Sequence, residues 1–256
     1  MTTLLKIEGL SKYFGGLAAV NNFHLDLGEG ELIGLIGPNG AGKTTIFNLI
    51  TGVYKPTSGT ITCGGRNLVG LKSHQITARG ISRTFQTIRL YGDLSVWQNV
   101  AMGSQFRVKY NLADAILRLP AYYREEEAIR KKAFELLDLF GLHNRRYELA
   151  KNLPYGEQRR LEICRALAAD PELLLLDEPA AGMNPNEVNE LLRLIRWVHK
   201  EFKLTTILIE HQMKLVMQIC PQIVVIDFGQ IIATGTPAEI QNNQSVIEAY
   251  LGKLED

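Results

Sequence analysis

The spacing of apolar and polar positions along the chain predicts an α/β fold. Residues 32–36 and 173–176 are short, unbroken apolar runs, as expected for parallel strands that are buried on both faces of a sheet. Residues 204–209 form the next predicted strand, and the pattern over residues 5–34 is mostly that of strands.

Segments of helical periodicity lie between these strands. Apolar residues recur at the spacing of one helix face over residues 46–50 and again over residues 188–198. The second of these helices begins at a capping box, residues 184–187, with proline at its first helical position. Another capping box, residues 236–239, predicts a final helix directly after a hairpin over residues 223–233.

One long segment interrupts the alternation of strands and helices. Residues 94–150 are helical in pattern and more charged than their surroundings. We predict a single domain over residues 1–256 in which residues 88–158 form an inserted helical subdomain. Residues 1–87 and 159–256 then form the α/β core, which includes an antiparallel β subdomain.

Composition sets limits on the function. Of 256 residues, 46% are apolar and 21% are charged, as in a globular protein with a sizeable core. The net charge of +1 predicts no nucleic-acid partner. No apolar run approaches the ~18 residues of a membrane span, and the first residues lack the apolar centre of a signal peptide. We therefore expect any membrane role to come through a partner chain, and the three widely spaced cysteines to be reduced.

Residues 37–45 match the P-loop pattern G-x-x-x-x-G-K-[ST], between a predicted strand and a predicted helix. The glycines let successive backbone N–H groups turn toward a bound anion, and the helix N-terminus adds its dipole. Lys43 supplies a positive charge for the β- and γ-phosphates, and the Thr44 hydroxyl can ligate Mg²⁺. The predicted nucleotide-binding residues here are Gly37, Pro38, Asn39, Gly40, Ala41, Gly42, Lys43, Thr44 and Thr45.

Polar residues follow two of the predicted central strands. Asp177 and Glu178 come directly after the apolar run 173–176, where packing gives little reason for two carboxylates. Beside a P-loop, one carboxylate is suited to hold Mg²⁺ and the other to polarise a water molecule. His211 follows the run 204–209, at the end of the strand where ligand-binding groups gather in such sheets.

Two further positions carry less specific signals. Gln86 ends a predicted strand over residues 80–86, and its amide oxygen can accept a hydrogen bond from water or ligate Mg²⁺; the alternative is an ordinary surface glutamine. Tyr13 and Phe14 precede a Gly-Gly pair, and either ring can stack on an adenine base or pack in the core.

In order and spacing, these motifs resemble those of the ATP-binding cassette subunits of ABC transporters. The resemblance covers nearly the whole chain, and it includes a signature at residues 153–158 as well as the P-loop. More narrowly, the chain is similar to the cassette of branched-chain amino acid importers, which pairs with a second, different cassette. This finer resemblance is carried by residues 83–86, 153–163, 177–185 and 248–252.

The resemblance implies a P-loop NTPase core with an antiparallel β subdomain and an inserted helical subdomain. Two cassettes would close head to tail on ATP, with each nucleotide held between the P-loop of one cassette and the signature of the other. It also implies the roles of single residues. Phe14 would stack on adenine, with Tyr13 as the substitute. Thr44, Gln86 and Asp177 would surround Mg²⁺. The implied catalytic residues are Glu178, which acts on the attacking water, His211, which contacts the γ-phosphate, and Lys43 and Gln86.

The signature departs from the family's common Leu-Ser-Gly-Gly-Gln. Pro154 stands at the serine position, Tyr155 at the following glycine and Glu157 at the glutamine. The serine hydroxyl that would reach the partner's γ-phosphate is missing, although backbone N–H groups near Gly156 and the helix dipole can still serve. Tyr155, Gly156 and Glu157 are therefore the predicted nucleotide contacts. In the loop expected to cross the dimer interface, Asn184 stands where the family commonly has aspartate.

The resemblance thus implies an ATPase that drives the import of a small solute, a branched-chain or other amino acid. We expect it on the cytoplasmic face of the inner membrane as a peripheral subunit. The implied partners are integral-membrane permease subunits, a second cassette that is identical or different, and indirectly an external solute-binding protein. A permease coupling helix is expected to dock near Gln86 and residues 87–91.

Two rival functions fit parts of the sequence. The cassette of a lipid or lipopolysaccharide exporter has a similar layout. The altered signature also suits a non-transport binding or assembly module that holds ATP and hydrolyses little, although the intact Glu178 and His211 favour hydrolysis.

Overall fold

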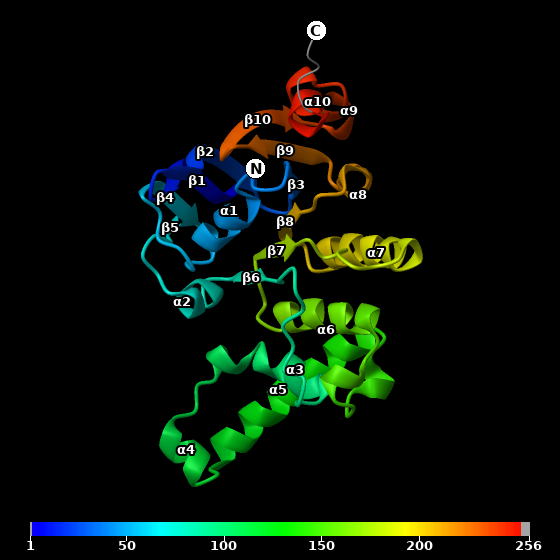
Figure 1. Cartoon of the computed structure of the whole chain (residues 1–256). Coiled ribbons are helices and arrows are strands. Elements are labelled where there is room, and N and C mark those ends of the chain that lie inside the picture. Colours follow the sequence, from blue (N-terminus) through cyan, green and yellow to red (C-terminus); the bar gives the residue numbers. More distant parts are fainter. Residues whose placement is uncertain (1, 252–256) are drawn as a thin grey trace. The chain divides into compact units, whose positions relative to one another are not determined.

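The computed structural model of the protein describes residues 2–251, and these form two compact units (Figure 1). The first unit comprises the chain up to Arg83 together with the chain from Glu172 onward, and the second is Thr84–Pro171. The second unit begins at Thr84 where residue 88 was predicted, and it ends at Pro171 where residue 158 was predicted, so the whole of the helix Tyr155–Leu167 belongs to it.

A six-stranded sheet forms the centre of the first unit. Its strand order is β10(Gln230–Gly235), β9(Gln222–Asp227), β3(Leu32–Ile36), β8(Thr205–Ile209), β7(Leu173–Asp177), β6(Ile81–Arg83). All neighbouring pairs are parallel except β9 and β10, which form the predicted hairpin. Every residue of β3, β7 and β8 is buried, as expected for strands covered on both faces, and all are apolar except Asp177 in β7 and Thr205 and Thr206 in β8.

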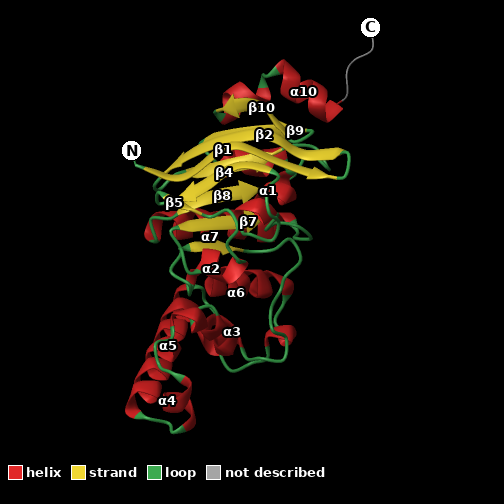
Figure 2. Ribbon diagram, turned by 90° about the vertical axis from the view of Figure 1, so that its left-hand side faces the viewer, coloured by secondary structure: helices red, strands yellow, loops and turns green. Residues whose placement is uncertain are grey.

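A second, antiparallel sheet of four strands completes the β structure of this unit (Figure 2). Its order is β2(Leu17–Gly28), β1(Thr3–Phe14), β4(Ser58–Cys63), β5(Arg66–Asn67). Alternate residues of β1 and β2, such as Leu5, Ile7 and Phe23, enter one hydrophobic cluster with residues of β3 and of the helix after the P-loop. The predicted antiparallel subdomain is therefore confirmed, and it shares its core with the parallel sheet.

The helices of the first unit are α1(Lys43–Ile50), α2(Ser73–Thr77), α7(Pro185–Glu201), α8(Met213–Ile219), α9(Pro237–Gln241) and α10(Gln244–Leu251). Both predicted capping boxes are confirmed. The Asn184 side chain accepts from the backbone N–H groups of Asn186 and Glu187, and Thr236 accepts from Glu239. The predicted final helix is two helices, because Asn243 caps a new start with a hydrogen bond from the Val246 N–H.

The second unit is helical, as predicted. It contains α3(Val96–Met102), α4(Leu112–Ile116), α5(Pro120–Leu139) and α6(Tyr155–Leu167), with short 3₁₀ turns between them. α5 buries Ala133, Leu136 and Leu137 and leaves its charged residues in solvent, where Arg130 pairs with Glu127. Within residues 2–251, no helix has the length and apolar character needed to cross a membrane.

Candidate functional site

The P-loop connects β3 to α1, and close backbone contacts explain its glycines. A side chain at Gly37 would place its Cβ 2.1 Å from the Ile226 carbonyl oxygen. Gly42 has φ of +105°, and a Cβ there would lie 2.4 Å from the Ala19 oxygen. The loop is also tied to the β9–β10 turn, since the Gly229 N–H donates to the Ala41 oxygen at 2.9 Å.

Lys43 is buried at the base of this loop. Its Nζ donates to the carbonyl oxygens of Gly37 at 2.7 Å and Pro38 at 2.8 Å. Burial lowers the pKa of Lys43, while the carboxylates of Glu178 and Asp177 act in the opposite direction. Lys43 therefore lies close enough to both predicted acids, Glu178 and Asp177, for their charges to affect its pKa.

Asp177 is held by an arginine that sequence reasoning missed. The Arg83 Nη2 lies 2.6 Å from the Asp177 Oδ2, and both side chains are almost fully buried. Arg83 also donates to the Asn48 Oδ1 at 2.7 Å and packs over the Phe47 ring, so α1 helps to fix it. The buried position of Arg83 at the end of β6 orients the Asp177 carboxylate.

Glu178 and His211 meet at the carboxyl ends of neighbouring strands. β7 and β8 are paired in register, with Asp177 opposite Ile209, so the residues after them are neighbours. The His211 Nδ1 lies 3.3 Å from the Glu178 Oε2, and the Glu178 N–H donates to the Ile209 oxygen at 2.9 Å. Glu178 also has φ of +43°, a left-handed conformation that is uncommon for a non-glycine residue. The geometry makes these two residues a pair, a contact that the sequence did not predict.

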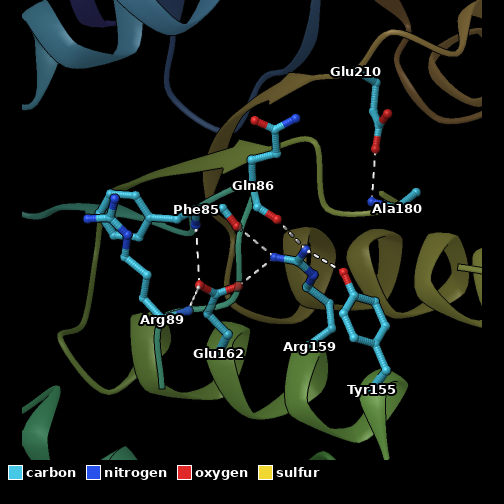
Figure 3. Close-up of polar contacts among 8 residues, drawn as sticks. All are labelled: Phe85, Gln86, Arg89, Tyr155, Arg159, Glu162, Ala180 and Glu210. Carbon is cyan, nitrogen blue, oxygen red and sulfur yellow. Dashed lines mark hydrogen bonds and ion pairs between the residues drawn. The ribbon is translucent and has the colours of Figure 1, made fainter. Parts of the chain in front are cut away.

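Glu210 is a second buried acid beside this pair, and it too was not predicted. Its Oε1 accepts from the Ala180 N–H at 2.9 Å (Figure 3), and its Oε2 has no hydrogen-bond partner among the described residues. Burial raises the pKa of Glu210. Glu210 thereby ties the loop after Glu178 to the end of β8.

The two aromatic candidates lie in solvent. Tyr13 is 43% exposed and Phe14 is 42% exposed, so neither belongs to the core. The Phe14 ring packs edge-on against Tyr54 with centroids 5.2 Å apart, and the Lys12 ammonium lies 5.0 Å from its centroid. The core-packing alternative is excluded, and an exposed, laterally supported Phe14 ring is suited to stacking.

The remaining candidates belong to the second unit. β6 ends at Arg83, so Gln86 lies three residues beyond the strand, and the predicted strand over residues 80–86 was too long. The exposed Gln86 side chain points away from α6, whereas its backbone faces that helix (Figure 3). The structure thus places Gln86 with the signature, and it places the P-loop, Asp177, Glu178 and His211 in the first unit.

The altered signature forms the first turn of α6. Pro154 is the N-cap and contributes no side-chain cap, and Tyr155 is 41% exposed. Glu157 lies in the first turn, where the helix dipole favours an acid, and it pairs with the Arg145 Nε at 2.9 Å. Gly156 leaves the backbone of this turn accessible between them.

The last described helix, α10, carries a buried tyrosine hydroxyl. Burial raises the pKa of Tyr250 to about 12. Of the final predicted stretch, 248–252, Gly252 lies outside the described residues.

The residues present fit a magnesium nucleotide better than a metal held by protein alone. No group of three or more His, Cys, Asp or Glu side chains within residues 2–251 could hold a metal ion. Thr44 is exposed at the start of α1, on the loop whose glycines leave its backbone uncovered. Mg²⁺ in such sites is bound by one or two protein groups together with phosphate oxygens, which matches a hydroxyl and the Asp177 carboxylate.

Fold and site together define an ATPase of the ATP-binding cassette class, and comparison with known proteins agrees. The chain belongs to the ABC transporter family, whose model matches residues 20–181. A second model, described as branched-chain amino acid ATP-binding cassette transporter, matches residues 230–256.

Individual relatives cover almost the whole chain. The chain is 48% identical to the high-affinity branched-chain amino acid transport ATP-binding protein LivG of Salmonella typhimurium, over 98% of both chains. It is 43% identical to the corresponding protein BraF of Pseudomonas aeruginosa, again over 98% of both. Identity to the lipopolysaccharide export ATP-binding protein LptB of Haemophilus influenzae is 32%, with the same coverage.

Solved structures show the same fold. The ADP conformation of MJ1267, an ATP-binding cassette of an ABC transporter, superposes with a TM-score of 0.85 at 28% identity. The match covers 99% of this chain and 100% of that one. The expected family and fold are therefore confirmed.

Proposed function

We propose that this chain binds and hydrolyses ATP as the cassette subunit of an importer for branched-chain amino acids. The observation that carries the proposal is the Glu178–His211 pair, 3.3 Å apart at adjacent strand ends, in the unit that also holds Lys43 and the P-loop. The names and higher identities of LivG and BraF, relative to LptB, favour amino acid import over lipopolysaccharide export.

In this proposal the chain's own groups position the nucleotide and the attacking water. Residues 37–45 cradle the phosphates, and Phe14 stacks on the adenine. Thr44, Asp177 and Gln86 would hold Mg²⁺, which neutralises phosphate charge when bound. Glu178 accepts a proton from the water, while His211 donates to the γ-phosphate; charge stabilisation and positioning then account for the catalysis.

The partners follow from the same proposal. A second cassette, the same or different, closes head to tail on this one, and its nucleotide meets Tyr155, Gly156 and Glu157. Permease subunits hold the pair at the cytoplasmic face of the inner membrane, and an external protein delivers the solute to them. The surface near Arg89, which stacks over Phe85 at 4.4 Å, receives the permease.

Replacement of the proposed base tests the function. In the complex assembled with its permease subunits, Glu178→Gln should leave ATP binding intact and lower turnover by at least roughly 100-fold, because the water loses its proton acceptor. Glu190→Gln, an exposed change on α7, serves as the matched control and should retain turnover. Full ATPase activity in Glu178→Gln would reject the role of this residue.

The altered signature motivates one rival, an ATP-binding module that hydrolyses little. Pro154 removes the side-chain hydroxyl expected at the start of α6. Steady ATPase activity that disappears in Lys43→Ala would exclude this rival. Tight nucleotide binding without turnover in the unaltered complex would favour it.

A further inference from the structure

A fully buried ion pair on α6 has no part in the function proposed so far. The Arg159 Nη1 lies 2.6 Å from the Glu162 Oε2, one turn farther along the same helix. Their side chains are 0% and 1% exposed. Burying two charges is costly unless further hydrogen bonds satisfy them, so the remaining contacts show what the pair is for.

Those contacts converge on one short stretch of backbone (Figure 3). Arg159 donates through Nη1 to the Phe85 carbonyl oxygen at 2.7 Å and through Nη2 to that of Gln86 at 2.9 Å. Glu162 accepts through Oε1 from the N–H groups of Phe85 and Arg89, each at 3.3 Å. Both polar groups of the Phe85 backbone are thus held, one by each member of the pair.

Side-chain packing adds to this fixation. The Arg89 guanidinium lies 4.4 Å from the Phe85 ring centroid, and the Tyr155 hydroxyl lies 3.4 Å from the Arg159 Nη2. Gln86, between the held residues, turns its amide away from the pair (Figure 3). A planar guanidinium that bridges two successive carbonyl groups fixes the peptide planes on either side of that side chain.

We propose that Arg159 and Glu162 are positioning residues for ATP hydrolysis: they lock residues 85–89 onto α6 and so set the direction of the Gln86 side chain. This inference rests on the proposed function. α6 begins with Tyr155-Gly156-Glu157, so one helix carries the signature and fixes Gln86. The helix that carries the residues proposed to contact the partner's nucleotide therefore also fixes Gln86, which is proposed to act on the chain's own nucleotide.

Replacement of both charges separates positioning from stability. Arg159→Met alone leaves the buried Glu162 carboxylate without its guanidinium partner and should lower the melting temperature by at least about 5 °C. Adding Glu162→Met removes that charge and should restore most of the melting temperature. Turnover of the assembled complex should stay at least roughly tenfold low in the double variant, with KM for ATP nearly unchanged, because Gln86 remains misdirected. Recovery of turnover together with the melting temperature would overturn the proposal.

Two companions make the test specific. Glu127→Met/Arg130→Met removes an exposed pair of the same residue types and spacing on α5, and it should leave turnover unchanged. Arg159→Lys keeps the buried charge but replaces the planar, five-donor guanidinium with a shorter, non-planar group that cannot match all of its contacts to Phe85, Gln86 and Glu162, so it should fold and still lose turnover. Wild-type turnover in Arg159→Lys would contradict a positioning role.

Amide hydrogen exchange provides a readout that needs no activity. In the full-length chain without nucleotide, a peptide over residues 84–91 should exchange faster in the double variant, while peptides within α6 keep their protection. Unchanged protection of residues 85–89 would overturn the positioning role. An unaltered complex that hydrolyses no ATP would overturn only the proposed function, so the two failures are distinguishable.

Discussion

Two buried acids, Asp177 at the end of β7 and Glu210 directly after β8, have different partners. Asp177 is paired with the Arg83 guanidinium at 2.6 Å. Glu210 accepts a backbone hydrogen bond from Ala180, and its Oε2 lies 3.7 Å from the His211 Nδ1. Burial therefore raises the pKa of Glu210, which keeps its proton to higher pH than an ordinary glutamate.

The raised pKa of Glu210 predicts a pH-dependent stability. Between the ordinary glutamate pKa and the raised native value, the native state binds more protons than the unfolded state, so stability falls as pH rises through that window. Glu210→Gln cannot ionise and should lack this decline. Denaturant unfolding at intervals from about pH 4 to pH 8 would measure the difference, and parallel curves for the two proteins would contradict the prediction.

The Arg83–Asp177 pair predicts a large loss of stability when it is broken. Arg83→Met leaves a buried carboxylate without its guanidinium and should cost about 3–5 kcal/mol of unfolding free energy. Arg130→Met, which breaks an exposed pair on α5, should cost less than about 1 kcal/mol. Urea titration of both variants gives the comparison; equal losses would show that Arg83 does not act through Asp177.

Among single residues, sequence motifs predicted part of the candidate site. Residues 37–45, Asp177, Glu178 and His211 were predictable because each follows a recognisable strand. Arg83 and Glu210 were missed because their partners lie far away in the sequence or on the backbone of another loop. A charged residue between a buried strand that ends in three apolar residues and His211 was the available signal for Glu210.

At the scale of elements, α7 depends on its first turn. Asn184 accepts from the N–H groups of Asn186 and Glu187, and the Glu187 side chain accepts from the Asn184 N–H at 2.9 Å. Asn184→Ala should cost about 1 kcal/mol of stability, whereas Asn184→Asp should preserve it.

A matched change in the same helix checks this prediction. Asn189 is exposed within α7, so Asn189→Ala should be neutral or slightly stabilising because alanine is the better helix former. Thermal unfolding of the three variants measures the effect. A loss at Asn189 equal to that at Asn184 would attribute the change to the helix in general and not to its cap.

Elements with strong periodicity were predicted well, and their ends less well. The buried strands and both capping boxes agree with the structure because pattern and local hydrogen bonding point the same way. The strand before Gln86 was predicted too long because the backbone of Phe85 and Gln86 bonds to Arg159 and Glu162 on α6. No local pattern contains that tertiary contact.

For the whole molecule, the division into units depends on such contacts as well. The predicted boundary at residue 158 divides α6, whereas the whole helix belongs to the second unit and contacts α3 and α5. Its Arg159 and Glu162 also hold the chain just after β6. The sequence indicates an inserted helical segment, but the limits of that segment depend on the packing of α6 against α3 and α5.

The proposed assembly is a prediction at this scale. Tagged protein captured from gently solubilised membranes should bring two integral-membrane chains and a second cassette, because the proposed function requires a permease and a head-to-tail pair of cassettes. Mass spectrometry identifies the captured chains. An untagged sample gives the background. Capture of soluble proteins alone would reject the importer assignment.

The attachment of the P-loop to the β9–β10 turn has a consequence for biosynthesis. The ribosome makes the loop well before it makes Gly229, whose N–H bonds to the Ala41 oxygen. β9, which pairs with β3 beside the loop, is also synthesised late. A growing chain therefore carries the P-loop long before the surroundings that shape it exist. We therefore expect a chain truncated before β9 to bind nucleotide less tightly than the full chain, because its P-loop lacks these contacts.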